Sequence, residues 1–88
     1  MEWVFTITFD RRLLRLRAKL INSDSFYELI QVSGSNRSIV LQSNRPMLLN
    51  KGLRHRKVYW KLKEGVVHNP YVLDLIIKNV EDYLRVYG

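Results

Sequence analysis

The sequence predicts an α+β fold, in which an antiparallel sheet of about five strands carries one C-terminal helix on one of its faces. Three observations support this fold class. Apolar and polar residues alternate with a period of two in several segments, polar turn-forming stretches separate these segments, and the residues after Pro70 carry apolar side chains at helical spacing. At 88 residues the chain fits a single domain, residues 1–88, because two halves would each bury too little surface to offset chain entropy.

The first predicted hairpin begins at the N-terminus. Aromatic and β-branched residues alternate there in the manner of a half-buried strand, with Trp3, Phe5, Ile7 and Phe9 on one face. The segment 13–21 consists of good helix formers, but a helix would place Arg17 in the middle of its apolar arc. A strand instead puts the leucines and the basic residues on opposite faces, so we predict a second strand and a turn at Asp10 to Arg12.

A second hairpin and a last strand follow. Residues 26–32 have extended character, the SGSN stretch tolerates turn dihedral angles, and residues 37–42 favour a strand. Pro46 lacks a backbone donor, so we expect Asn44 to Arg56 to be a loop with at most a short extended piece. The final strand is predicted over Lys57 to Glu64.

Asn69 and Pro70 predict the start of a helix, because asparagine caps free amides and proline loses nothing at the first helical position. Apolar residues then follow at helical spacing and form a stripe that would dock on the sheet: Leu73, Ile76, Ile77, Val80, Tyr83, Leu84 and Tyr87. On the opposite side we expect two i,i+4 ion pairs, Asp74 with Lys78 and Glu81 with Arg85.

The charge of the chain is strongly basic and unevenly distributed. The formal net charge is +7, and two acid-free segments, Arg11 to Lys19 and Arg45 to Lys63, hold most of the 15 lysines and arginines. Such segregation favours a nucleic acid, an anionic membrane surface or an acidic protein as a partner. It does not choose among them.

Several classes of function are not expected. The chain has no cysteine and only two histidines, His55 and His68, so neither a metal site nor a cofactor is predicted. The longest uncharged run, residues 65–73, is far shorter than the roughly 20 apolar residues of a membrane span. The N-terminus lacks the pattern of a signal peptide, which leaves a cytoplasmic location as the default expectation. Without a catalytic constellation we expect no enzyme activity.

Alternation predicts where the cations lie. If the helix covers the leucine face of the strands, the uncovered face carries the residues Arg15, Arg17, Lys19, Tyr59, Lys61 and Lys63. Cations and an aromatic ring on a sheet form a known platform for single-stranded nucleic acid, and the predicted loop could extend it with Arg45, Lys51, Arg54 and Arg56. The alternative is an ordinary solvated face, because lysine and arginine also keep exposed strands soluble.

A second surface is predicted on the C-terminal helix. Val72, Leu75 and Val86 fall outside the main apolar stripe, on a neighbouring flank. They could bind another protein or a second copy of the chain, which would then be a homodimer instead of a monomer. A wider apolar arc wedged into the sheet would also explain them.

The segment 38–65 contains N-R-P, then K-G-L-x-H-R, then a tryptophan. In this order of motifs it resembles a family of small uncharacterised bacterial proteins. The resemblance covers about a third of the chain, and it implies no activity because that family has no assigned role.

Overall fold

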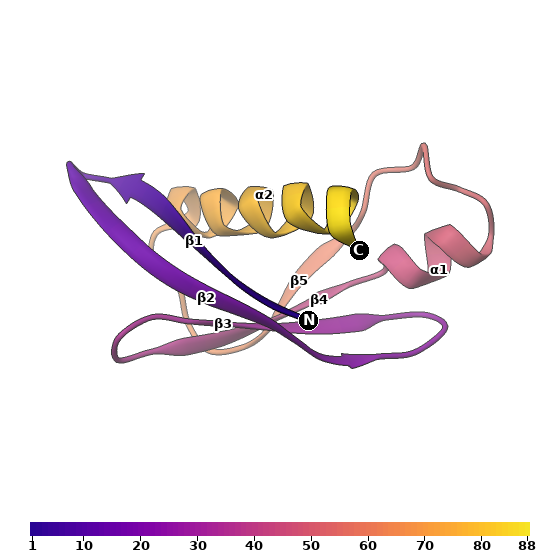
Figure 1. The fold of residues 1–88 in the computed structure, drawn as a ribbon, viewed down its shortest axis with the longest axis horizontal. Coiled ribbons are helices and arrows are strands. Elements are labelled where there is room, and N and C mark those ends of the chain that lie inside the picture. The colour runs from indigo at the N-terminus through magenta and orange to yellow at the C-terminus, as the bar shows by residue number, and fades with distance from the viewer.

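A five-stranded antiparallel sheet in the order β1-β2-β3-β4-β5 forms the body of the computed structural model, which describes residues 1–88. The strands are β1 (Glu2–Phe9), β2 (Arg12–Ser23), β3 (Glu28–Ser33), β4 (Ser38–Ser43) and β5 (Trp60–Glu64). The long helix α2 (Pro70–Tyr87) lies along one face of this twisted sheet, and the short helix α1 (Arg45–Asn50) connects β4 to β5 (Figure 1). The predicted α+β fold class is confirmed.

The first hairpin is confirmed and turns more tightly than predicted. Asp10 and Arg11 both have positive φ, 51° and 61°, so the turn has two residues and β2 begins at Arg12. Positive φ at both central residues matches the right-handed twist of the flanking strands. The β2 strand extends beyond the predicted segment, and its pairing with β3 shifts register between Leu20 and Asn22.

The second hairpin is also confirmed, but β3 begins two residues later than predicted, at Glu28. Asp24 forms the preceding turn, in which its Oδ1 accepts the N–H groups of Tyr27 and Phe26 at 2.8 Å each. These two hydrogen bonds lower the pKa of the Asp24 carboxyl below its ordinary value, and the bond from Tyr27 has the larger effect.

The prediction of a loop from Asn44 to Arg56 was wrong in its first half, which forms α1. Pro46 is compatible with a helix there because it lies in the first turn, where its missing N–H has no intrahelical partner to lose. The predicted last strand was too long at its start, since β5 begins only at Trp60. Just before β5, the N–H of Tyr59 donates to Asn44 Oδ1 at 2.8 Å.

The C-terminal helix is confirmed with its predicted cap, because Asn69 Oδ1 accepts the N–H of Tyr71 at 2.9 Å. The two expected i,i+4 ion pairs do not form. Arg85 instead donates to Asp82 at 2.8 Å, and Glu81 accepts the indole N–H of Trp60 at 2.9 Å. Glu81 therefore fastens α2 to β5.

The core lies between α2 and the facing side of the sheet, and it joins all five strands. Its residues include Ala18 from β2, Ile30 from β3, Leu41 from β4 and Val80 from α2, each with no exposed surface. The Trp3 ring of β1 stacks on Tyr83 of α2, with centroids 4.0 Å apart. Neither helix is long and apolar enough to cross a membrane.

Candidate nucleic-acid interface

The face of the sheet turned away from α2, which we call the outer face, carries a row of cations on β2. Arg15 lies opposite Thr6 of β1, Arg17 opposite Val4 and Lys19 opposite Glu2. The alternate residues of β2 point into the core, as the complete burial of Ala18 shows, so these three basic side chains must point outward. All three are exposed.

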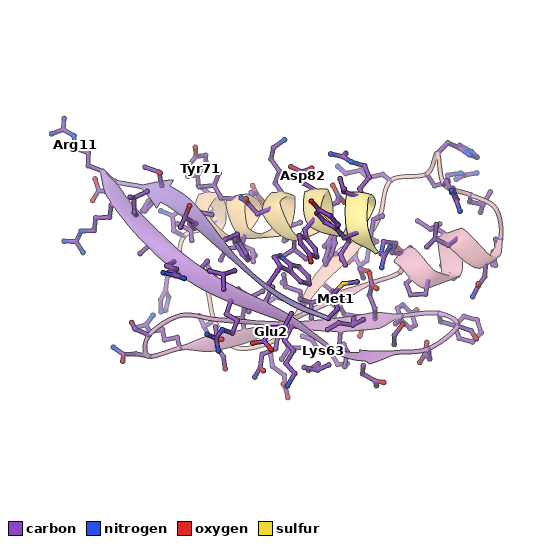
Figure 2. The ribbon with its side chains drawn as sticks, in the orientation of Figure 1. Met1, Glu2, Arg11, Lys63, Tyr71 and Asp82 are labelled. Carbon is purple, nitrogen blue, oxygen red and sulfur yellow. The ribbon has the colours of Figure 1, made fainter.

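The second row of cations on the outer face comes from β5. Trp60 and Leu62 of this strand pack against the core, and alternation therefore turns Lys61 and Lys63 outward. Figure 2 shows Lys63 and Glu2 on the side of the sheet away from α2. Tyr59 comes just before the strand and is 69% exposed, and alternation continued by one residue would turn it to the side of Lys61.

Two neutral strands separate the cation rows. The rows on β2 and β5 are three strand spacings apart, or about 14 Å. Between them, Gln31 of β3 lies opposite Lys19, and Gln42 of β4 lies opposite Lys61. Sequence reasoning missed both glutamines, although their alternation with buried apolar residues could have placed them on this face. Their amides can donate and accept hydrogen bonds.

Few carboxylates oppose these cations. Arg17 pairs with Glu2 at 3.4 Å, with 64% and 48% of the two side chains exposed, which contributes at most about 1 kcal/mol. Arg15, Lys19, Lys61 and Lys63 have no carboxylate within ion-pair distance. The outer face therefore has a net positive charge that is free to attract an anion.

Arg45, which was predicted to extend the nucleic-acid site, lies apart from the outer face, and a buried carboxylate binds its guanidinium. Its Nε and Nη2 donate to the two carboxylate oxygens of Glu28, at 2.7 and 2.9 Å. Glu28 is 1% exposed and also accepts a hydrogen bond from the Ser43 hydroxyl at 2.9 Å. Because both carboxylate oxygens hold the guanidinium, Arg45 is a structural residue that ties the start of α1 to β3.

The loop cations form a second basic region, separate from the outer face. Lys51, Arg54 and Arg56 are exposed, and Figure 1 shows their loop rising beside the C-terminal end of α2. Arg54 and Arg56 line a cavity of about 390 Å³ together with Lys57, Arg85, Glu81 and apolar side chains that include Leu84. The loop therefore does not extend the outer face directly.

The predicted protein-binding flank of α2 is partly absorbed into the core. Val72 and Leu75 are half-buried and pack against core residues, whereas Val86 is 69% exposed. His55 and His68 are both exposed, and no group of three or more metal-ligating side chains forms anywhere in the structure.

Comparison with known proteins gives no relative: no family model, no curated protein and no solved structure matches the chain. The resemblance of residues 38–65 to a bacterial family stays a prediction. What the protein does is therefore inferred from its own geometry and charge.

Proposed function

We propose that the protein is a non-enzymatic domain that binds single-stranded nucleic acid on the outer face of its sheet. One observation carries the proposal: two rows of exposed cations lie on the face that α2 leaves uncovered, and most of them lack a carboxylate partner. These cations are Arg15, Arg17, Lys19, Lys61 and Lys63.

Each group on this face has a part in the proposed complex. Lysines and arginines neutralise phosphates, the exposed Tyr59 ring stacks on a base at about 1–3 kcal/mol, and the glutamines between the rows meet base edges. A strand laid across the rows can place phosphates on both, because about 14 Å is roughly the reach of a few nucleotides. An unpaired strand is required, since duplex bases are not free to stack on Tyr59.

Salt dependence is the first test. Fluorescence anisotropy with a labelled oligothymidine or oligouridine should show affinity falling with salt, with a log–log slope of about −3 if four or five phosphates are contacted. An equally long duplex should bind more weakly. Failure to bind single strands at about 50 mM salt would rule out the proposal.

Charge reversal locates the site. The variant Arg15→Glu/Lys61→Glu removes one unpaired cation from each row and should weaken binding by about tenfold or more. The control Arg11→Glu/Lys78→Glu makes the same charge change at the hairpin tip and on α2, where both residues are exposed. If both variants lose affinity equally, only the net charge matters and the outer face is not the site.

The cavity beside α2 favours a second candidate function, the binding of a small phosphorylated molecule. Its volume of about 390 Å³ lies in the range of ordinary ligand pockets, and its lining of cations and apolar side chains suits a phosphate attached to an apolar body. Titration with adenosine monophosphate should shift the amide resonances of residues 53–58. The Arg54→Ser/Arg56→Ser variant should abolish these shifts and spare oligonucleotide binding. This function would be excluded if adenosine monophosphate caused no shifts in the unmodified protein, or if the same shifts persisted in the Arg54→Ser/Arg56→Ser variant.

A further inference from the structure

The open edge of β1 presents unpaired backbone groups. In the β1–β2 ladder, Leu20 N–H donates to the carbonyl oxygen of Met1 at 3.0 Å. Hydrogen-bonded positions alternate along an antiparallel strand. The backbone N–H and C=O groups of the odd-numbered residues of β1 therefore point toward β2, and those of the even-numbered residues point away from it. The outward-facing residues are Glu2, Val4, Thr6 and Thr8, and no other backbone or side-chain group bonds to their own N–H and C=O groups.

This edge lacks the protection that edge strands normally carry. β1 is eight residues long, pairs with β2 without a register shift, and contains neither lysine nor proline. The other edge strand, β5, is five residues long and carries Lys61 and Lys63. The contrast marks β1 as the edge that can accept another strand.

An apolar flank of α2 overlooks this open edge. The stack of Tyr83 on Trp3 and the tilted contact of Tyr71 with Phe9, at 5.9 Å, show that α2 runs along β1. At about 100° per residue, Leu75 and Val86 lie on the same flank as Tyr83. Leu75 is half-buried and Val86 is exposed. A strand added to β1 could therefore pack the side chains of its inner face against this apolar surface.

Charge selects the occupant. A second copy carries the same net charge of +7, so pairing two copies through β1 would bring two basic chains together. An extended segment of another protein that carries acidic residues meets the opposite charge instead.

We propose that β1 accepts an extended segment of a partner protein as a sixth strand, with apolar and acidic residues in alternation. Apolar residues would face Leu75 and Val86 of α2. Acidic residues would lie on the outer side, in the field of Arg15 and Lys19 and of a chain with net charge +7.

The test uses a defined peptide of about ten residues that alternates valine and glutamate, with blocked termini. Amide hydrogen exchange is followed by NMR with and without the peptide. The outward amides of Val4, Thr6 and Thr8 should exchange rapidly in the free protein and at least about tenfold more slowly in the complex. A peptide of the same length with proline at alternate valines should give no protection, because it cannot form the ladder.

A variant separates strand addition from simple charge attraction. Thr6→Pro removes an outward N–H without touching the ladder to β2, whereas Thr6→Val keeps that N–H and serves as the control. Thr6→Pro should weaken peptide binding by about tenfold and leave oligonucleotide binding unchanged. The proposal is overturned if the alternating peptide does not bind at about 1 mM, or if Thr6→Pro binds it normally. Protection that rises with protein concentration alone would also overturn it, in favour of a second copy.

Discussion

Removal of Arg45 should destabilise the protein more than removal of its partner Glu28. The two side chains form a bidentate pair in which Glu28 is 1% exposed and the Arg45 side chain 18% exposed. In Arg45→Met the apolar stem of the side chain is kept, but the Glu28 carboxylate stays buried without its cation. Breaking a buried pair in this way costs about 3–5 kcal/mol.

Substitution of the other partner, Glu28, should lower the free energy of unfolding by less. In Glu28→Gln the amide can still accept the Ser43 hydroxyl, and the partly exposed Arg45 guanidinium can turn to water. We expect a loss of about 1–3 kcal/mol. The double variant Glu28→Met/Arg45→Met leaves no charge behind and should recover much of the stability lost in Arg45→Met, because well-packed apolar residues often replace a buried pair at little cost.

Equilibrium urea unfolding measures all three variants. With a slope of about 1–3 kcal/mol per molar urea, the loss expected for Arg45→Met shifts the midpoint by more than about 1 M. The native domain should have only about 5–15 kcal/mol of stability, so this loss is a large fraction of the whole. A loss below about 1 kcal/mol, or a larger loss in Glu28→Gln than in Arg45→Met, would refute the reasoning.

Three further predictions concern the turns and the contact between α2 and β1. Gly65→Ala should lower the free energy of unfolding, measured in urea, by about 1–3 kcal/mol, and Gly52→Ala should lower it less. Both glycines have positive φ, but only at Gly65 would an added Cβ come within 2.8 Å of neighbouring atoms. Asp24→Ala should lower the melting temperature at neutral pH, and should lower it much less at about pH 2. The pKa of Asp24 is lowered because the ionised carboxylate accepts the hydrogen bonds of the turn, so its stabilising contribution is lost as the pH falls through that pKa. A difference independent of pH would contradict this. Tyr83→Leu removes the stack on Trp3, so it should lower the free energy of unfolding by about 0.5–1.5 kcal/mol more than the loss of buried apolar surface alone would. No loss in urea unfolding would show that the stack contributes nothing.

Local patterns were sufficient to predict most of the fold. Alternation in β1 and β2 gave the first hairpin, and Asn69 with the apolar stripe gave α2, because each signal lies within a few adjacent residues. The six-residue α1 was missed for the opposite reason. Asn44 and Pro46 are typical of loops as well as of helix starts, and so short a segment has no apolar periodicity to decide between them.

The candidate site was predictable only where strand alternation alone decides it. Arg15 and Lys61 lie on the outer face as alternation requires. The fate of Arg45 depends on Glu28, which is 17 residues away in sequence, so no local pattern could reveal that its guanidinium is already bound. The placement of Arg54 beside α2, away from the outer face, likewise depends on how the loop packs against the helix.

NMR mapping of oligonucleotide binding tests the central claim most directly. A ¹H–¹⁵N titration with unlabelled oligothymidine should shift the amides of the outer-face strands, centred on Arg17, Gln31, Gln42 and Lys61. The resonances of the exposed side of α2, such as those of Lys78, should stay in place. Shifts confined to the loop at residues 53–58, or no shifts at low salt, would contradict the account.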